Sequence, residues 1–149
     1  MEALAPPEPL GAAHDAAAFA CGVSALDAWL RQAPHAGTFV VHEGGRVRGF
    51  YTLAPGSVRD WHGPPGRALP ILKLGRLAVD LPGIGSGLVV DAFARTYAAS
   101  RRVPLAALLV DAPEPAGGWF RELGFLPVAG DPSAMFVALG TIERLVEGK

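Results

Sequence analysis

The sequence predicts one α/β domain over residues 1–149, with a mixed central sheet of six or seven strands flanked by three or four helices. Two observations carry this prediction. Strand-like runs rich in β-branched residues alternate with helix-like segments, and a strand, a glycine turn, a helix and a second apolar strand follow one another between residues 71 and 110. A chain of 149 residues, 50% of them hydrophobic, is long enough for one substantial core and too short for two ordinary ones.

The first part of the chain is expected to form an arm and then a short helix. Residues 1–11 are rich in proline and acidic residues, which is typical of an extended arm. Ser24 to Asp27 has the sequence of a capping box, in which the Ser24 side chain would accept a hydrogen bond from the Asp27 N–H. This pattern predicts a helix from about residue 24 to 32.

A hairpin and a long loop are expected next. The β-rich runs 38–42 and 47–53 are separated by Gly44 and Gly45, a pair that suits the tight turn of an antiparallel hairpin. Residues 54–69 contain repeated glycines and prolines, which interrupt regular structure and predict a loop.

The rest of the chain alternates between strand and helix patterns. Residues 105–110 form a continuous apolar run, as in strands buried on both faces, so the segment between 71 and 110 predicts two parallel neighbours joined by a crossover helix. The other expected elements are a helix carrying Leu88, Ala92, Arg95 and Ala99, a short helix 119–123 stopped by Gly124, strands 125–128 and 135–139, and a last helical segment 141–147.

The composition argues against two classes of partner. Lys and Arg number 13 and Asp and Glu 14, which gives a formal net charge of -1 and no global field that favours nucleic acid or an anionic membrane. No apolar run approaches the roughly 20 residues that a membrane-spanning helix needs. The single cysteine, Cys21, has no partner for an internal disulfide, and the N-terminus lacks the features of a signal peptide. We therefore expect a cytoplasmic protein.

The most informative segment is the strand that ends at Asp80 and the glycine-rich turn that follows it, Pro82-Gly83-Ile84-Gly85-Ser86-Gly87. A strand that leads through closely spaced glycines into a helix places backbone N–H groups and the positive end of a helix dipole together. The pattern predicts a phosphate site. The alternative is a tight structural connection between strand and helix.

Four sequence blocks occur in one order and with a familiar spacing: Phe19–Leu30, Gly45–Ala54, Pro70–Asp80 and Trp119–Phe125. With these blocks the chain resembles the GNAT acyltransferases, and among them the toxin-type members of bacterial toxin–antitoxin pairs. The resemblance covers roughly residues 8–139. It implies an acetyl-CoA-dependent N-acetyltransferase that acts on a primary amine, which in toxin-type relatives is that of an aminoacyl-tRNA. It also implies an antitoxin or a second copy of the chain as a partner.

The resemblance further implies where the CoA thioester lies. In the family, the strand before the glycines pairs with the pantetheine arm, and the amides of the glycine turn hold the diphosphate. In this sequence the pantetheine falls on Leu77, Ala78 and Val79, and the diphosphate on Gly83, Ile84, Gly85, Ser86, Gly87 and Leu88.

The chain departs from the family pattern at three places. Pro82 stands where the glycine signature has Gln or Arg, and Phe120 stands where the family often has a tyrosine that acts as general acid to the CoA thiolate. The segment 31–37 is shorter and less basic than in toxin-type relatives. Loss of a general acid typically slows catalysis by about 10²- to 10⁴-fold. These departures favour a second hypothesis, a catalytically impaired GNAT-fold protein that acts as a binding partner or ligand sensor.

Other side chains are weaker candidates for catalysis. Tyr51 and Tyr97 are the only tyrosines, and packing explains both positions more easily than an acid role. His35, His42 and His62 are candidates for a base, but His42 and His62 are expected to lie in solvent. No set of histidines and carboxylates has the spacing of metal ligands, so we expect no metal.

The remaining candidates concern packing and the acceptor. Cys21 is expected to be a small buried residue rather than a nucleophile. For Arg76 and Asp80, the alternative to a functional role is a surface ion pair of little consequence. Trp61 is a candidate contact residue, and the acceptor amine is expected to enter past residues 56–69. Four arginines either line the acceptor cleft or are scattered solvated charges: Arg46, Arg48, Arg59 and Arg67.

Overall fold

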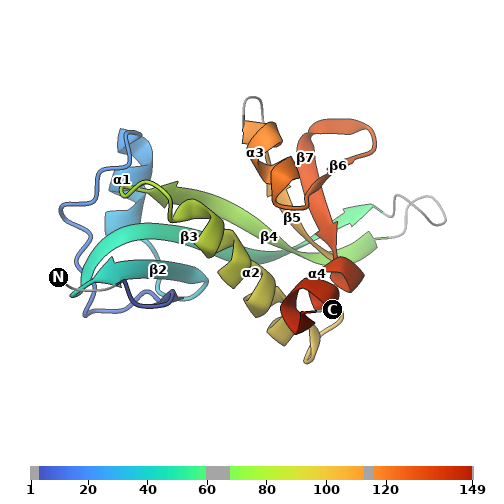
Figure 1. Ribbon diagram of the computed structural model, residues 1–149, viewed down its shortest axis with the longest axis horizontal. Coiled ribbons are helices and arrows are strands. Elements are labelled where there is room, and N and C mark those ends of the chain that lie inside the picture. The colour runs from blue at the N-terminus through green and yellow to red at the C-terminus, as the bar shows by residue number, and fades with distance from the viewer. Residues whose placement is uncertain (1–3, 60–67, 113–115, 149) are drawn as a thin grey trace. The chain divides into compact units, whose positions relative to one another are not determined.

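The computed structural model describes residues 4–59, 68–112 and 116–148. These residues form seven strands and four helices, which confirms the predicted α/β fold with a mixed sheet (Figure 1). In chain order the elements are β1 (Glu8–Pro9), α1 (Ser24–Arg31), β2 (Thr38–Glu43), β3 (Arg46–Arg59), β4 (Ala68–Val79), α2 (Gly85–Ser100), β5 (Ala107–Asp111), α3 (Ala116–Glu122), β6 (Leu126–Val128), β7 (Asp131–Ala138) and α4 (Leu139–Glu147). Within these described ranges, no helix has the length and apolar character needed to cross a membrane.

The strands form one sheet in the order β1-β2-β3-β4-β5-β7-β6. The β2–β3 pair is antiparallel, as the hairpin prediction required, and the turn between them uses positive φ at Gly44 and Gly45. β4 and β5 are parallel, which confirms the crossover through α2. β5 and β6 both pair antiparallel with β7.

The pairing of β4 with β5 is short. Its register runs from Ile71 opposite Ala107 to Leu74 opposite Val110, whereas β4 continues to Val79. The last residues of β4 therefore extend beyond the register with β5. A backbone edge in this position can hydrogen-bond to an extended ligand that carries amide groups.

By the density of its internal contacts, the chain divides into two compact units. The first unit is Met1–Leu53 with Arg76–Asp91, and the second is Ala54–Gly75 with Ala92–Lys149. The elements β3, β4 and α2 contribute residues to both units. The single domain over 1–149 stays a prediction.

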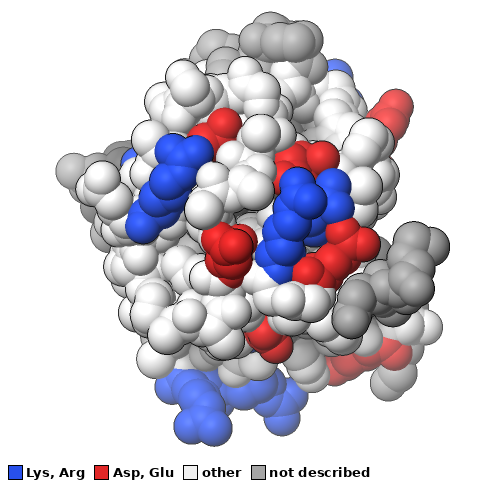
Figure 2. All heavy atoms as spheres, turned by 90° about the vertical axis from the view of Figure 1, so that its left-hand side faces the viewer, with Lys and Arg blue, Asp and Glu red and all other residues white. Residues whose placement is uncertain are grey.

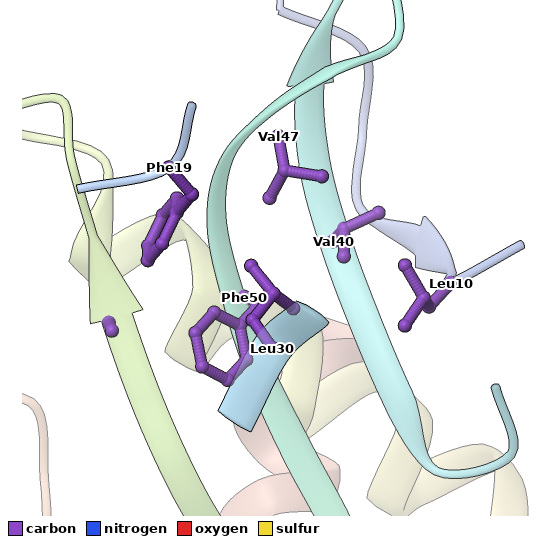
Figure 3. Packing of buried hydrophobic residues seen from close by; sticks show 7 residues of the cluster. Leu10, Phe19, Leu30, Val40, Val47 and Phe50 are labelled. Atoms are coloured by element: carbon purple, nitrogen blue, oxygen red, sulfur yellow. The ribbon is translucent and has the colours of Figure 1, made fainter. Parts of the chain in front are cut away.

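The first unit has a hydrophobic core built around Phe50 of β3. Phe19 packs edge-on against Phe50 with ring centroids 5.6 Å apart, and Trp29 of α1 stacks on it at 5.8 Å with an interplanar angle of 15°. The buried residues of this cluster are Leu10, Phe19, Leu30, Val40, Val47, Phe50 and Ala78 (Figure 3). The core therefore joins α1 and the N-terminal segment to β2, β3 and β4.

The second unit has a core of its own. Ile71 of β4 packs with Ala107 and Leu109 of β5. On α2 and α3, the rings of Phe93 and Phe120 both contact Phe125, with centroids 5.8 Å and 5.3 Å away.

The predicted loop 54–69 is wrong at both ends. β3 continues to Arg59 and β4 begins at Ala68, so every described position between 54 and 69 is strand. β3 and β4 are neighbours in the sheet, and pairing along a long partner strand overrides the local preference of glycine and proline. Residues 60–67, which include Trp61, His62 and Arg67, lie outside the described residues.

The helix predicted at 24–32 is confirmed as α1, but its capping box is wrong. Val23 is the N-cap residue and no side chain caps the helix. The Asp27 carboxylate instead accepts a hydrogen bond from the Cys21 N–H at 3.0 Å, and the Asp27 N–H donates to the Val23 carbonyl at 3.2 Å. The Asp27 side chain therefore binds the segment before α1 at Cys21.

Candidate functional site

The connection between β4 and α2 exposes backbone N–H groups. The Leu88 N–H donates to the Ile84 carbonyl at 3.3 Å, so Gly85, Ser86 and Gly87 precede the first such bond of the helix. Gly83 has a φ of +89°, which lets the chain reverse before the helix. A Cβ on Gly83 or Gly87 would meet no atom within 4 Å. The backbone is thus open to close approach by an anion.

Backbone groups and the helix dipole supply the attraction for an anion here. The first turn of α2 contains no acidic residue that would repel a phosphate. Pro82 lies in the bend before Gly83 and carries no side-chain donor. The strand, turn and helix that the sequence predicted are therefore present, and the residues Gly83 to Leu88 lie together at the start of α2.

Close packing against β3 fixes this turn. A Cβ on Gly49 would lie 3.1 Å from Ile84 Cδ1, 3.1 Å from Val41 Cγ1 and 3.2 Å from Leu88 Cδ1. These distances are shorter than ordinary contacts. The glycine turn and the first turn of α2 can therefore pack this closely against β3 only because residue 49 has no side chain.

A pocket of about 320 Å³ adjoins the glycine turn. The N-terminal segment, β2 and the start of α2 all contribute to its lining. Its lining residues are Leu4, Pro7, Val41, Gly83, Ile84, Ser86, Gly87 and Leu88. The pocket places an apolar wall next to the exposed amides.

A charged network fixes the end of β4. The Asp80 side chain is only 4% exposed and accepts a hydrogen bond from Arg48 Nε at 2.6 Å. Arg48 also donates to Glu43. The hydrogen bond to Asp80, followed by that to Glu43, raises the pKa of the Arg48 guanidinium above its ordinary value. Arg48 therefore has a structural partner on each side.

The Arg76–Asp80 ion pair, one alternative for these residues, does not form, because Asp80 pairs with Arg48. The Arg76 guanidinium instead lies over the Trp29 ring, 4.2 Å from its centroid. The Arg76 N–H donates to Thr52 Oγ1 at 2.8 Å. Arg76 is exposed, so the stacked guanidinium faces solvent.

Sequence reasoning missed a cluster of Glu8, His14 and His42, whose ligand atoms lie within 4.8 Å of one another. The expectation that His42 lies in solvent is wrong, since its side chain is 18% exposed. The residues are far apart in the sequence, and they meet because Glu8 pairs with Val40 on β2, two positions before His42. Strand pairing, which no local pattern records, creates the cluster.

The hydrogen bonds of this histidine cluster define its protonation. Nδ1 of His14 accepts from the Gly11 N–H at 2.8 Å, and Nδ1 of His42 accepts from the Gly45 N–H at 3.0 Å. Each Nε2 therefore carries the proton and donates to Glu8 Oε1, at 2.7 and 2.8 Å. A metal would need the Nε2 lone pair and a proton at Nδ1, where it would oppose a backbone N–H. The cluster is built to hold the N-terminal segment rather than a metal.

The aromatic residues considered for the role of general acid are held in place by packing and hydrogen bonds. Tyr51 is fully buried and its hydroxyl donates to Asp91. The Tyr97 hydroxyl donates to Glu147 at 2.8 Å, and this bond raises the pKa of Tyr97 above its ordinary value. Phe120 is 6% exposed and offers no proton. This arrangement favours structural roles for the two tyrosines.

The remaining candidates divide between the core and the surface. Cys21 packs against the first-unit core, and burial, followed by its hydrogen bond with Asp27, raises the pKa of its thiol. His35 and Arg46 are exposed, and the Arg59 side chain lies outside the described part of the structure. On the face drawn in Figure 2, basic and acidic side chains lie side by side rather than forming one large basic area.

Comparison with known proteins gives clear relatives. No protein-family model matches the chain. It is 36% identical over 130 residues to a protein of Mycobacterium tuberculosis named tRNA-acetylating toxin, covering 75% of this chain and 78% of that protein. The solved structure of AtaT complexed with acetyl-methionyl-tRNAfMet matches with a TM-score of 0.84 and 29% identity, over 97% of this chain and 99% of the other. A mutant AtaT toxin bound to acetyl-CoA and the C-terminus of the antitoxin AtaR matches with a TM-score of 0.83 and 29% identity, over 96% and 98%.

Proposed function

The chain belongs to the GNAT toxins that acetylate tRNA, and from this premise we propose that it moves the acetyl group of acetyl-CoA to the amino group of an aminoacyl-tRNA. It is an acetyl-CoA-dependent N-acetyltransferase that acts on a primary amine. The aminoacyl-tRNA acceptor is supported by two relatives, one named for tRNA acetylation and one solved with an acetylated aminoacyl-tRNA.

The observation that carries the cofactor site is the open start of α2. In the proposed arrangement the diphosphate lies on the backbone N–H groups from Gly83 to Leu88, where the helix dipole favours negative charge. The pantetheine arm runs along Leu77, Ala78 and Val79, the part of β4 that extends beyond its register with β5. The amides of the arm then replace the hydrogen bonds that a neighbouring strand would make.

Acetyl transfer needs little covalent help from the protein. The amine lone pair attacks the thioester carbon, a C–N bond forms, the C–S bond breaks, and the proton of the amine ends on the CoA thiol or in solvent. Holding the two reactants in line supplies much of the acceleration. Phe120 has no proton for the leaving thiolate, so the proposed reaction relies on positioning and runs without a tyrosine acid at that place.

The partner of this toxin is an antitoxin. A mutant AtaT toxin is solved bound to the C-terminus of the antitoxin AtaR. The structural match between that toxin and this chain covers 96% of this chain. An antitoxin that covers the cofactor or acceptor region would block the reaction by exclusion.

The net charge of -1 does not decide against an RNA acceptor. Phosphate contacts depend on the cations at the contact, and a few well-placed arginines are sufficient for a local interaction. The charge balance therefore requires that RNA be held by specific side chains rather than by a broad basic face.

Acetyl-CoA binding by calorimetry and acetyl transfer to an aminoacyl-tRNA test the proposal together. Gly87→Glu places bulk and like charge at the phosphate turn, and Gly118→Glu adds the same side chain at an exposed, open position of α3. We expect micromolar binding by the wild type and by Gly118→Glu, and at least about tenfold weaker binding by Gly87→Glu. Binding without transfer would support the sensor hypothesis instead, and absence of binding by the wild type would overturn the cofactor site.

A further inference from the structure

We propose that Arg76 and Trp29 form a platform that binds the 3′-terminal phosphodiester of the acceptor RNA, next to the reacting end of acetyl-CoA. This inference rests on the proposed function, since it names the part of the aminoacyl-tRNA that the protein holds. The platform consists of the Arg76 guanidinium, the Trp29 ring beneath it and the Phe50 ring beneath that.

The platform is rigid at its base. Phe50 is fully buried in the first-unit core, and the Trp29 ring stacks nearly parallel to it, with centroids 5.8 Å apart. The Arg76 guanidinium lies 4.2 Å from the Trp29 centroid, within the range of a cation–π interaction. At the backbone, the Arg76 N–H is held by Thr52 Oγ1 at 2.8 Å. Both ends of the arginine are therefore positioned before any ligand arrives.

The guanidinium is also available for an anion. Among the residues that the structure describes, no Asp or Glu forms an ion pair with Arg76, and the nearest candidate in the sequence, Asp80, is held by Arg48. A guanidinium that lies flat on a ring keeps the N–H donors of its edges, and these match the oxygens of a phosphate. Arg76 thus combines a fixed plane with unsatisfied donors at the surface.

The direction of the cofactor places this platform beside the reaction. In the proposed site the diphosphate lies at Gly83 to Leu88, and the pantetheine passes Val79 and then Leu77. The thioester end therefore continues toward Arg76, the next residue back along β4. The acceptor has to present its amine there.

The chemistry of the acceptor indicates which anion meets the guanidinium. In an aminoacyl-tRNA the carboxyl group of the amino acid is esterified and carries no charge. The anion that remains near the amine is the phosphodiester of the terminal nucleotide. A free amino acid would offer a carboxylate instead, so the two acceptors can be distinguished by experiment.

Arg76→Gln removes the positive charge, and Arg76→Lys keeps the charge but replaces the planar guanidinium with an ammonium group. Arg102→Gln is the control, because Arg102 is an exposed arginine just after α2 and is not a candidate for the acceptor cleft. We measure kcat and KM with an aminoacyl-tRNA and with an aminoacyl-adenosine, which has the same ester and amine but no phosphodiester. Melting temperatures confirm that each variant is folded.

We expect Arg76→Gln to raise the KM for aminoacyl-tRNA about tenfold, which corresponds to the loss of one phosphate contact. The KM for acetyl-CoA and the kinetics with aminoacyl-adenosine should stay within about twofold, and the slope of log KM against log salt for aminoacyl-tRNA should fall by about one. Arg76→Lys should lie between the wild type and Arg76→Gln. Equal losses with both acceptors, or an Arg102→Gln effect of the same size, would overturn the platform.

A separate outcome tests the proposed function alone. If the wild type binds acetyl-CoA but acetylates no aminoacyl-tRNA, the acceptor proposal fails. The platform is then tested by fluorescence anisotropy with a short single-stranded RNA ending in CCA. Weaker binding by Arg76→Gln than by Arg102→Gln would still support the platform, and equal binding would overturn it.

Discussion

Arg48 and Asp80 are joined twice, once through their side chains and once through their backbones. Arg48 Nε donates to Asp80 Oδ1 at 2.6 Å, and the Asp80 N–H donates to the Arg48 carbonyl at 2.9 Å. The Ala20 N–H also donates to the Asp80 carboxylate, at 3.4 Å. Asp80 follows β4 directly, so these bonds fix the point where the chain leaves the sheet and enters the glycine turn.

We predict that Asp80→Asn lowers the melting temperature by roughly 5 °C, because charge-assisted hydrogen bonds with a buried carboxylate are lost. It should also weaken acetyl-CoA binding, since the glycine turn begins two residues later at Pro82. Circular dichroism and calorimetry measure the two effects. Asp111→Asn is the control, because Asp111 is 59% exposed in its pair with Lys73 and such pairs contribute little. If both variants melt alike, the Asp80 network does not stabilise the fold.

Gly49→Ala tests whether the close packing of the glycine turn against β3 depends on the absence of a side chain at residue 49. The new Cβ would crowd Ile84 and Leu88, so we expect a loss of about 1–3 kcal/mol in the free energy of unfolding. Acetyl-CoA affinity should fall as well, because the turn is pushed away from β3. Gly118→Ala adds a methyl group to an open position of α3 and should leave both quantities unchanged or slightly raise stability. Denaturant unfolding measures the free energy of unfolding, and calorimetry measures the affinity for acetyl-CoA. Unchanged values for Gly49→Ala would mean that the position of the turn does not depend on the missing side chain.

Phe120→Tyr tests the missing acid. If the family resemblance places residue 120 correctly, the new hydroxyl should raise kcat for acetyl transfer by about 10²-fold, the lower end of the usual range for a general acid. Trp119→Tyr supplies a phenol at the neighbouring, 38% exposed position and should give no increase. Acetyl-transfer assays at saturating acetyl-CoA, stopped at fixed times, measure the change in kcat. An unaltered rate with an unaltered melting temperature would mean that residue 120 does not face the leaving thiolate.

The parts of this protein that sequence predicts well are those fixed by local chemistry. The Gly44-Gly45 hairpin, the crossover through α2 and the helix stop at Gly124 follow from glycine conformation and apolar periodicity over short spans. Family resemblance added the cofactor residues Leu77 to Val79 and Gly83 to Leu88, an assignment that stays a prediction.

The parts that sequence missed depend on partners far along the chain. Arg76 and Asp80 have the spacing of a pair, yet Arg48, 32 positions before Asp80, takes the carboxylate. The strands β3 and β4 run through glycine- and proline-rich positions because each has the other as a neighbour in the sheet. The histidine cluster needs the pairing of β1 with β2, and β1 is too short to leave a periodic signal.

The histidine cluster predicts a dependence of stability on pH. Hydrogen bonds from His14, and then from His42, hold the pKa of Glu8 below its ordinary value. Since the folded pKa is lower than the unfolded pKa, the contribution of Glu8 to stability is fully present above the unfolded pKa of about 4.3 and is lost as the pH falls through the folded value. The melting temperature should therefore fall in acid partly because this carboxylate gains a proton.

Glu8→Gln isolates this effect, because glutamine keeps the size of the side chain and cannot carry the charge. We expect the variant to melt below the wild type at pH 7, and the gap between them to close below about pH 4, where Glu8 is protonated in the unfolded chain and increasingly so in the folded protein. ¹⁵N NMR of the imidazoles adds a readout that packing alone would not move: His14 and His42 should both carry the proton on Nε2 in the wild type. A constant gap across the pH range, or Nδ1 tautomers, would contradict the hydrogen-bond pattern. In that case the N-terminal segment beside the pocket would be held by its core packing at Leu10 and its backbone bonds to β2, among them that from the Ala5 N–H to the His42 carbonyl.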